Sequence, residues 1–343
     1  MNHGSRKPLI ERISRRSDSI LEAFEGKTVS ILGGSGFIGS WISEVFRYQI
    51  EQGLRCNVKV LSRSGSLTTQ IDLGNRSNYF KSFKVDLSGE IPDEIRDSDY
   101  FLIAATASSP SHGGNDGKMI ERTTKGIVAY LEELAVTPLS KDKKLVHLSS
   151  GAVHRIHGVA KSKYPEDDDV SRHSRNPYIQ AKIDLEMASR KLQSGNSGWR
   201  VSNPRIFTLY GPGLATDAHF AIGNFVASGI RKQNIEIHGN PETVRSYLHI
   251  ADLTVAILKL LANPVYSPIN LGSSIPIRMS NLAESVAAHF PASRVIQRDN
   301  SSSPSYYVPE TNTAVNYLGQ IESIDFSEGI QDWIEWLEKY QSE

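Results

Sequence analysis

Residues 28–46 restrict the fold more than any other part of the chain, because they combine three local patterns in a fixed order. Residues 28–32 are mostly β-branched or apolar and contain no turn residue, which predicts a buried strand. Three glycines follow at equal spacing: Gly33, Gly36 and Gly39. Apolar residues then recur at helical spacing as far as Phe46. A strand, a glycine turn and a helix in this order predict the first unit of a parallel α/β sheet.

The glycine turn also has the form of a site for a dinucleotide pyrophosphate. Its first glycine permits the tight turn, its second lets the backbone approach a phosphate, and its third lets the helix pack closely on the strand. The N-terminus of the helix offers free N–H groups and the positive end of the helix dipole. The alternative is an ordinary surface loop, which the strand before and the helix after disfavour. The residues expected to contact a cofactor here are Gly33, Ser35, Gly36, Phe37, Ile38 and Gly39.

Composition excludes several classes of protein. The 343 residues include 38 basic and 38 acidic side chains, so no overall charge attracts nucleic acid or an anionic membrane. No apolar run approaches the roughly 20 residues that span a bilayer. The polar first residues lack the apolar core of a secretory signal. A single cysteine, Cys56, rules out an internal disulfide framework and a cysteine metal cluster. We therefore expect a cytoplasmic protein with no metal, no nucleic-acid partner and no membrane partner.

Strands and helices alternate through the first two thirds of the chain. The predicted strands after the first are residues 58–61, 83–85, 100–104, 144–148 and 201–207, with helices to about residue 52 and over 118–135. This rhythm predicts a doubly wound parallel sheet with right-handed crossovers. Less regular segments follow, with helices predicted over 219–231, 252–262, 279–289 and 330–340 and short strands over 234–238 and 269–271.

Residues 1–26 precede the first strand and read as one or two amphipathic helices. Arg12, Arg15 and Arg16 lie on the polar side of this pattern. We interpret them as a solvated helix face, and a targeting or phosphate-binding patch is the alternative. Residues 155–176 are rich in charge, including Glu166, and predict an exposed loop.

Three strand ends supply further candidate cofactor contacts. Ser62 and Arg63 end the second strand, where an acid would bind the ribose of NAD and an arginine suits the extra phosphate of NADP. We therefore expect NADP, with NAD as second choice, unless Arg63 is only a surface loop residue. The other candidates follow the third and fourth strands: Asp86 and Leu87, which can reach the adenine, and the small residues Ala104, Ala105 and Thr106.

Tyr178 is the one tyrosine of thirteen with a lysine, Lys182, four residues later. Positions i and i+4 share a helix face, so the ammonium lies beside the phenol and favours its ionised form. Ser150 ends the fifth strand at the carboxyl edge of the sheet, where ligands bind in such folds. This placement favours a catalytic Ser–Tyr–Lys set over a surface pair. Glu186, one further turn along, is expected to be a surface partner.

Taken together, four motifs resemble the extended short-chain dehydrogenase/reductases, and more narrowly their nucleotide-sugar epimerase/dehydratase branch. The motifs are residues 33–39, residues 149–153, the Tyr178/Lys182 pair and residues 245–247. The resemblance covers about residues 27 to 340. It implies a Rossmann domain over residues 27–207 that holds NAD(P). It also implies a smaller mixed α/β domain over 208–343 that holds a nucleotide-diphosphate sugar, with segments near 245–275 returning to the Rossmann domain. A homodimer built on a four-helix bundle is implied as well.

The same resemblance gives each site residue a role. It implies that Ser150 polarises the sugar oxygen and that Tyr178 moves the proton. Lys182 would hold the nicotinamide ribose and lower the phenol pKa. The residues implied to bind substrate are Ser150, Gly151, Asn224 and Arg245, the last two at the diphosphate. A salt bridge to Glu242 or Asp252 is the alternative for Arg245, and Tyr247, His249 and Asp252 are expected to be structural.

The chain also departs from the family pattern next to Ser150. Gly151 and Ala152 stand where many 4,6-dehydratases carry an Asp-Glu pair, and the glutamate of the decarboxylase branch is missing too. His154 and Arg155 replace the signature tyrosine and glycine. An epimerase that keeps its cofactor and a 4-keto reductase that releases NADP both remain open. The further alternatives are a 4,6-dehydratase-like enzyme and a non-catalytic dinucleotide-binding regulator, although the latter would be expected to have lost Ser150, Tyr178 or Lys182.

Overall fold

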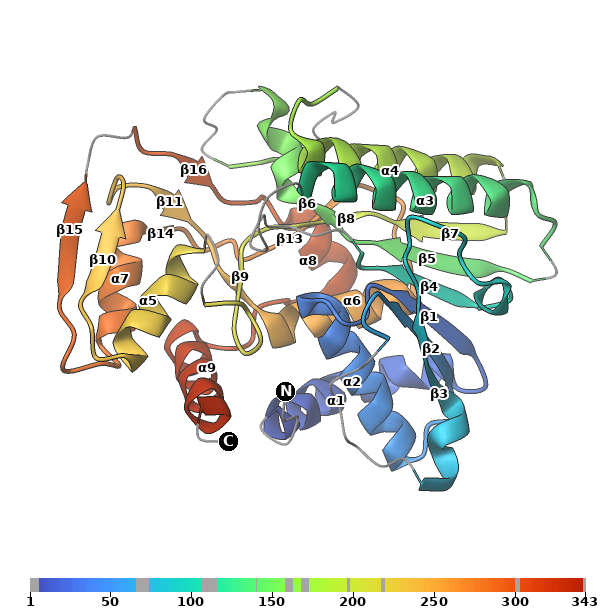
Figure 1. Cartoon of the computed structure of the whole chain (residues 1–343), viewed down its shortest axis with the longest axis horizontal. Helices are drawn as coiled ribbons and strands as arrows, with labels where there is room; N and C mark the ends of the chain where they lie inside the picture. Colours follow the sequence, from blue (N-terminus) through green and yellow to red (C-terminus); the bar gives the residue numbers. More distant parts are fainter. Residues whose placement is uncertain are drawn as a thin grey trace.

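The computed structural model describes residues 6–65, 74–105, 116–139, 141–157, 163–167, 173–195, 198–216, 220–299 and 303–341. These residues form an α/β sandwich with a smaller lobe beside it, and both ends of the chain lie near the junction of the two parts (Figure 1). No helix in the described ranges is long and apolar enough to cross a membrane. The expected cytoplasmic localisation stays a prediction.

A six-stranded parallel sheet forms the centre of the sandwich, in the order β3-β2-β1-β4-β5-β7. Its strands are β1 (Thr28–Leu32), β2 (Asn57–Ser62), β3 (Phe80–Lys84), β4 (Tyr100–Ile103), β5 (Lys143–His147) and β7 (Trp199–Ser202). The strand order reverses between β1 and β4, which leaves a crevice outside their carboxyl ends. The predicted Rossmann-type, doubly wound α/β fold is therefore confirmed.

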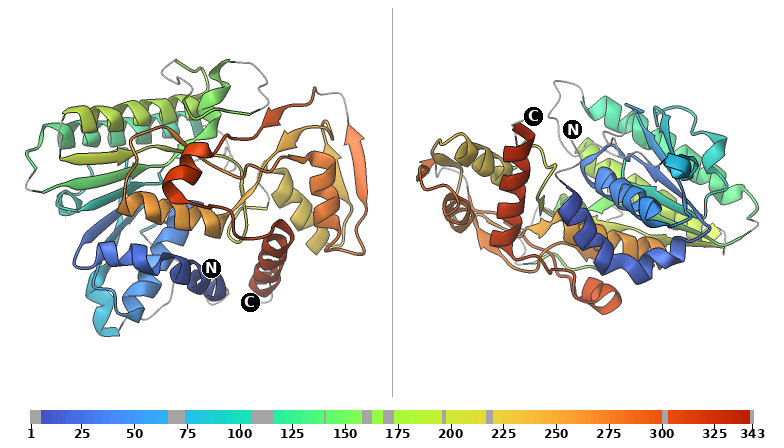
Figure 2. Two further views of the ribbon diagram at one scale, coloured as in Figure 1. Left: turned by 180° about the vertical axis from the view of Figure 1, so that it is seen from behind. Right: turned by 90° about the horizontal axis from the view of Figure 1, so that it is seen from below.

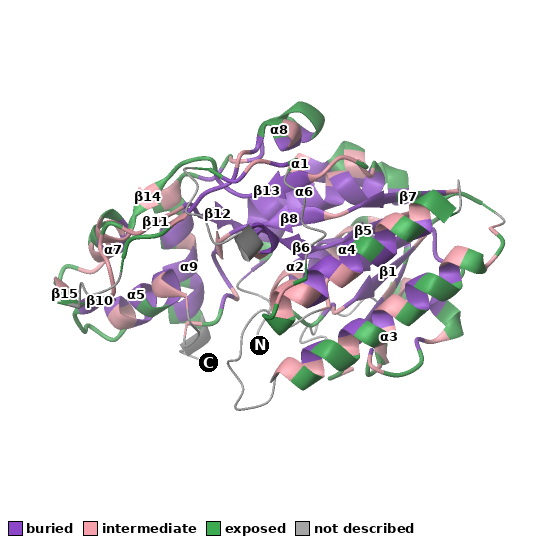
Figure 3. Ribbon diagram, turned by 90° about the horizontal axis from the view of Figure 1, so that it is seen from above, coloured by how far each residue is buried: buried purple, intermediate pink, exposed green. Residues whose placement is uncertain are grey.

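Helices cover both faces of this sheet, which explains why the strands read as continuous apolar runs. α3 (Asp116–Val136) and α4 (Pro177–Gly195) pack on one face, where Leu131, Leu192 and Trp199 share a core. α1 (Lys7–Leu21), α2 (Phe37–Gln52) and α6 (Ile250–Ala262) pack on the other, around Trp41 and Leu253. Figure 3 shows that α3 and α4 turn buried residues inward and exposed residues outward.

The strand predicted over 201–207 is divided between two sheets. β7 ends at Ser202, and β8 (Pro204–Ile206) joins a second parallel sheet with β13 (Ile269–Leu271) and β6 (Ser149–Ser150). Proline has no N–H to donate to a ladder and is tolerated at the first residue of a strand, which is the place of Pro204. The division sets β8 against β6, with Ser149 opposite Arg205.

The smaller lobe has its own apolar core, which includes Phe225, Ile237, Leu282 and Trp333. It consists of α5 (Ala221–Ile230), β10 (Ile235–His238), α7 (Met279–Ala287), β15 (Val295–Asp299) and α9 (Phe326–Gln341). Figure 2 shows these elements grouped apart from the sandwich. The predictions for residues 219–231, 234–238, 279–289 and 330–340 correspond to α5, β10, α7 and α9.

The remaining elements are short. The strands are β9 (Leu209–Tyr210), β11 (Val244–Arg245), β12 (Leu248–His249), β14 (Ile277–Arg278) and β16 (Tyr306–Tyr307). The short helices are α8 (Asn312–Leu318), η2 (Glu22–Phe24), η3 (Gly74–Tyr79), η4 (Asp93–Ile95) and η5 (Gly151–His157). β11 pairs with β14 and β16, and β9 pairs with β12. Pairings of two residues leave no periodic pattern, which is why these strands were not predicted.

The N-terminal helix α1 packs on the sandwich through buried Ile10 and Ile13. Its arginines correct the expectation of a solvated face. Arg16 forms an ion pair with Asp252 of α6 at 2.6 Å, and Arg12 forms one with Glu328 of α9 at 2.5 Å. The helix therefore contacts both the sandwich and the smaller lobe, whereas Arg15 is exposed.

Candidate active site

The glycine turn after β1 brings backbone close to backbone. Gly33 has φ +87°, and a Cβ added there would lie 2.7 Å from the backbone N of Ala105. A Cβ on Gly39 would overlap the carbonyl oxygen of Gly33. α2 begins at Phe37, and no side chain caps its N-terminus. Free N–H groups at the end of a glycine turn, without a side chain in the way, fit the pyrophosphate of a dinucleotide.

The other expected cofactor residues lie at the same edge in different environments. Ser62 is buried at the end of β2, while Arg63 is exposed and its Nη1 donates to Met119 Sδ at 2.8 Å. Asp86 is exposed, and the backbone N–H of Ser88 bonds to it at 3.0 Å and holds the pKa of its carboxyl below the usual value.

The remaining expected contacts line the turn or lie beneath it. Leu87 is buried in the sandwich core, and Ala104 and Ala105 are half-buried beside Gly33. Ser35 is exposed and Ile38 is half-buried. Thr106 lies outside the described residues.

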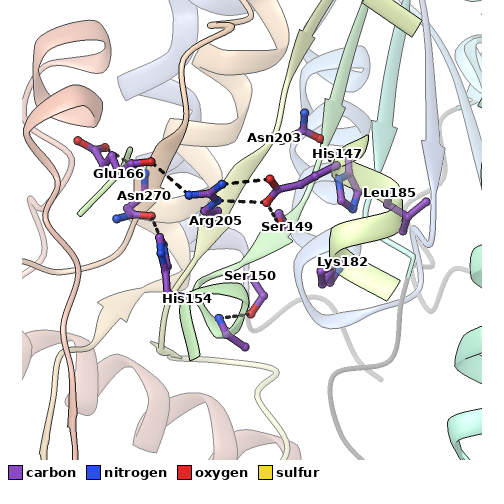
Figure 4. Close-up of polar contacts among 12 residues, drawn as sticks. His147, Ser149, Ser150, His154, Glu166, Lys182, Leu185, Asn203, Arg205 and Asn270 are labelled. Atoms are coloured by element: carbon purple, nitrogen blue, oxygen red, sulfur yellow. Dashed lines mark hydrogen bonds and ion pairs between the residues drawn. The ribbon is translucent and has the colours of Figure 1, made fainter. Parts of the chain in front are cut away.

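The structure brings Ser150, Tyr178 and Lys182 together. Tyr178 lies in the first turn of α4, where Asn176 Oδ1 accepts from the backbone N–H of Tyr178 at 3.0 Å and caps the helix. Lys182 Nζ lies 5.7 Å from the centroid of the Tyr178 ring and donates to the carbonyl oxygen of Leu148 at 2.7 Å. Figure 4 shows Ser150 and Lys182 on the same side of this region.

Burial sets the protonation of these groups. Burial raises the pKa of Tyr178, and a hydrogen bond with Ser150 acts in the opposite direction. Burial lowers the pKa of Lys182 to about 7, and the negative charge of Glu186 opposes that shift. Without a ligand, the phenol therefore holds its proton at neutral pH, and the lysine lies near its titration midpoint.

His147 is a neighbour of Lys182 that sequence reasoning missed. It ends β5, and its Nδ1 lies 3.0 Å from Asn203 Oδ1. Burial, together with the charge of Lys182, lowers its pKa to about 3, although the bond to Asn203 acts the other way. His147 is therefore neutral, and no positive charge is added beside the lysine. Its only signal in the sequence is a histidine at the end of a strand that is otherwise buried.

Glu186 is buried, so its expected surface role is wrong. The side chain is 2% exposed, and its Oε1 accepts from Ser149 Oγ at 2.6 Å and from Arg205 Nε at 3.2 Å. Its Oε2 accepts from Arg205 Nη2 at 3.2 Å and from Arg190 Nη2 at 2.9 Å. The helical spacing of Tyr178, Lys182 and Glu186 was the available signal, because it places all three toward one face.

Glu166 corrects the expectation of an exposed loop in the same way. It is buried, and its carboxylate accepts from the backbone N–H groups of Thr313 at 2.6 Å and Ala314 at 3.3 Å, at the start of α8. It also accepts from the backbone N–H of Asn270 at 3.0 Å. The backbone carbonyl oxygen of Glu166 accepts from Arg205 Nη1 at 3.2 Å, so the Arg205 guanidinium binds both the Glu186 carboxylate and the main chain at Glu166 (Figure 4).

The turn after Ser150 packs against aromatic rings. A Cβ on Gly151 would lie 2.5 Å from Phe207 Cε2 and 2.5 Å from Tyr307 Oη. His154 is buried, its Nε2 lies 3.2 Å from Asn270 Oδ1, and its ring stands 5.9 Å from that of Phe207. His154 therefore points into the protein, and these neighbours leave no space for a side chain at position 151.

The two expected diphosphate residues lie on separate elements. Arg245 in β11 is half-buried, and its Nη2 donates to Ser305 Oγ at 2.8 Å. Glu242 pairs instead with Arg278, and Asp252 with Arg16. Asn224 is exposed on α5.

Two residues expected to be structural are so. His249 Nδ1 accepts from the N–H of Ala251 at the start of α6. Asp252 accepts from the backbone N–H groups of Ser323 and Ile324, each at 3.1 Å.

Comparison with known proteins places this geometry in a family context. The profile of the NAD dependent epimerase/dehydratase family matches residues 29–272. UDP-glucuronic acid decarboxylase 1 from Arabidopsis thaliana is 29% identical over 158 residues, which are 46% of this chain and 36% of that protein. The chain thus spans about a third of the length of this curated relative.

Solved structures share the fold at low sequence identity. An epimerase from Methanothermobacter thermautotrophicus has a TM-score of 0.74 and 19% identity, covering 94% of this chain and 96% of that one. A UDP-glucose 4-epimerase from Thermotoga maritima, solved with UDP-glucose, has a TM-score of 0.73 and 20% identity, covering 92% and 99%. A UDP-glucuronic acid 4-epimerase from Bacillus cereus, solved with NAD, has a TM-score of 0.70 and 17% identity, covering 91% and 99%.

Proposed function

The chain belongs to the NAD-dependent epimerase/dehydratase family. We propose that it epimerises a nucleotide-diphosphate sugar by hydride transfer at a ring carbon, and C4 is the carbon we propose. One observation carries the proposal: Ser150 is bonded to Tyr178, with Lys182 against the same ring. Ser150 lies in β6, directly after β5, and β5 belongs to the same parallel sheet as β1, which precedes the glycine turn. A hydroxyl, a phenol and a cation together can remove a proton from an alcohol and stabilise the oxygen left behind.

Each residue of the chain has a defined part in this proposal. With cofactor and substrate bound, Tyr178 would act in its phenolate form and accept the proton of the sugar hydroxyl, and Ser150 would donate a hydrogen bond to the same oxygen. The charge of Lys182 favours the phenolate form of Tyr178. NAD held at the glycine turn would supply the acceptor for the hydride and the source of its return to the other face of the ring. Tyr178 would give the proton back to the same oxygen, so that the product is the epimer with no net oxidation.

NAD is the cofactor we propose, in place of the NADP expected from Ser62 and Arg63. The structural neighbour from Bacillus cereus was solved with NAD. Arg63 is exposed, and its guanidinium contacts Met119. No buried partner in the described residues fixes this guanidinium where the extra phosphate of NADP would bind. An epimerase also gains nothing from NADP, because it does not release a reduced cofactor.

Elimination and decarboxylation are disfavoured at this site, although relatives are named as a decarboxylase and as a UDP-glucose 4,6-dehydratase. Gly151 and Ala152 have no titratable group, and a longer side chain at 151 would meet Phe207 and Tyr307. His154, three residues beyond Gly151, is buried and turned toward Asn270. A net 4-keto reduction uses the same three catalytic residues and is the rival outcome of the test.

We propose that residues 208–343, apart from the segments near 245–275 that return to the sandwich, form the substrate-binding domain. Arg245 and Asn224 would bind the diphosphate there. The half-buried Arg245 guanidinium is already ordered by Ser305, and its planar fork matches phosphate oxygens. Two copies would pair through the outer faces of α3 and α4, where Met187 is 54% exposed.

The test is incubation of the purified protein with NAD and, separately, UDP-glucose, UDP-glucuronic acid and UDP-N-acetylglucosamine. We expect one of these to be converted to its C4 epimer, seen by nuclear magnetic resonance (NMR), with no net NADH. Formation of a 4-keto-6-deoxy sugar or of carbon dioxide would contradict the proposal. Consumption of added NADPH with a 4-keto sugar would assign the reductase instead.

A further inference from the structure

A buried ion pair lies directly behind the candidate catalytic residues. Glu186 and Arg205 are 2% and 1% exposed, and they meet through two N–H···O contacts of 3.2 Å. Resting on the proposed function, we propose that Glu186, held by Arg205 and Ser149, is a positioning residue that fixes α4 against β6 and places a negative charge one helical turn from Lys182.

The contacts join three elements at one carboxylate. Glu186 projects from α4, one turn beyond Lys182. Ser149, which donates to Glu186 at 2.6 Å, is the residue before Ser150 in β6. Arg205 comes from β8, where it stands opposite Ser149 in the parallel register. The carboxylate therefore ties the helix that carries Tyr178 and Lys182 to the strand that carries Ser150.

This tie acts on the geometry that the reaction needs. Tyr178, Lys182 and Glu186 follow one another at intervals of four residues, so a rotation or slide of α4 moves all three together. Displacement of reacting groups by about 1 Å can cost about 100-fold in rate. The hydrogen bond between Ser150 and Tyr178 runs from β6 to α4, the same two elements that Glu186 links through Ser149.

The same carboxylate acts on Lys182 by charge. In the described part of the chain, Lys182 faces Tyr178 and Glu186 from its own helix and the neutral His147 from β5. Glu186 in turn faces Arg205 from β8 and Arg190 from α4. Glu186 is thus the negative group that offsets the burial of Lys182, and neutralising it lowers the pKa of that lysine further.

The test compares Glu186→Gln with Glu44→Gln. Glu44 forms a second buried pair, with Arg6, so its variant breaks similar chemistry on the opposite face of the sheet. The ionisation of Lys182 is followed by NMR on labelled lysine, with its signal assigned by its loss in Lys182→Met. We expect Glu186→Gln to move the Lys182 midpoint down by about one pH unit or more and to lower kcat about tenfold or more. Glu44→Gln should lower the melting temperature and leave that midpoint in place.

Ser149→Ala is the milder variant, because it removes one hydrogen bond from Glu186 without leaving Arg205 unpaired. It should lower kcat by about threefold to tenfold with an unchanged KM. An unmoved Lys182 midpoint in Glu186→Gln, or equal shifts in both glutamine variants, would overturn the proposal. So would Ser149→Ala with wild-type kcat if Glu186→Gln does not fold. The NMR titration needs no substrate, so failure of the proposed activity leaves this test intact.

Discussion

Two buried arginine–glutamate pairs stabilise different regions of this protein, and their surroundings differ. Arg6 and Glu44 are each 4% exposed and meet at 2.9 Å, whereas Arg205 and Glu186 lie behind the candidate catalytic residues. The Arg6 guanidinium lies 4.7 Å from the Trp41 ring and 5.6 Å from the Trp336 ring. Glu186 instead collects hydrogen bonds from Ser149 and Arg190.

The difference shows that a buried arginine–glutamate pair can either hold separate parts of the fold together or position catalytic residues. Arg6 precedes α1, Glu44 is in α2 and Trp336 is in α9, so this pair connects the N-terminal segment, the sandwich and the smaller lobe. A Cβ on Gly213 would overlap Arg6, so the guanidinium fills the junction. The Glu186 pair connects α4, which carries Tyr178 and Lys182, to β8, and Ser149 links the same carboxylate to β6, which carries Ser150.

The largest effect on turnover is expected from Tyr178→Phe, which leaves both ion pairs intact. Loss of the proton-transfer group should lower kcat by about 10²- to 10⁴-fold, while NAD binding and thermal stability stay close to wild type. Steady-state kinetics, cofactor titration and melting curves measure this. Wild-type turnover would show that Tyr178 is not catalytic. The Glu186 pair would then have no catalytic residue to position.

Breaking either pair should cost comparable stability. Arg6→Ala and Arg205→Ala each leave a buried carboxylate without its main partner, and we expect each to lower the unfolding free energy by about 3–5 kcal/mol. Urea denaturation at neutral pH measures both. Arg205→Ala should also lower kcat in the protein that remains folded, whereas Arg6→Ala should not. Equal losses of kcat would erase the distinction between the two regions.

Acid should weaken the protein through two buried histidines, His147 beside Lys182 and His249 at the start of α6. Burial lowers the pKa of His147 to about 3 and that of His249 to about 4, below the ordinary value near 6.5. The unfolded chain therefore binds more protons as pH falls below about 6.5, and each histidine removes about 1.4 kcal/mol of stability per pH unit until its folded pKa is reached.

Denaturation at pH 7, 6 and 5 measures this slope. His249→Asn keeps a side chain that can cap α6 and should flatten the slope by the share of one histidine. An unchanged slope would show that His249 does not differ in protonation between the folded and unfolded states.

A smaller effect, on KM for the sugar nucleotide, is expected from a substitution at Arg245 in β11. Arg245→Lys replaces a planar fork by a point charge, and we expect KM for the sugar nucleotide to rise about tenfold, or about 1.4 kcal/mol. The kcat and the Kd for NAD should stay nearly unchanged, the pattern of lost uniform binding. An unchanged KM with a lower melting temperature would assign Arg245 to the scaffold through Ser305.

Local patterns in the sequence were enough to predict the Rossmann-type sheet, the glycine turn and the pairing of Tyr178 with Lys182. Each depends on a periodicity or a turn chemistry that acts over a few residues. A strand of apolar residues is buried wherever it pairs, and two residues four apart on a helix meet whatever the helix packs against. Ser150 was expected at the end of the fifth strand, whereas in the structure it lies in β6, which directly follows β5 and joins the second sheet.

Only the tertiary structure decided which charges are buried. Glu186 and Arg205 are 19 residues apart, Arg6 and Glu44 are 38 apart, and Arg16 and Asp252 are 236 apart. A glutamate on a helix carries no local mark of whether it meets water or a distant guanidinium, and the cost of its burial depends on that partner. Sequence therefore determined which side chains share a face, and the packing of distant segments decided what that face meets.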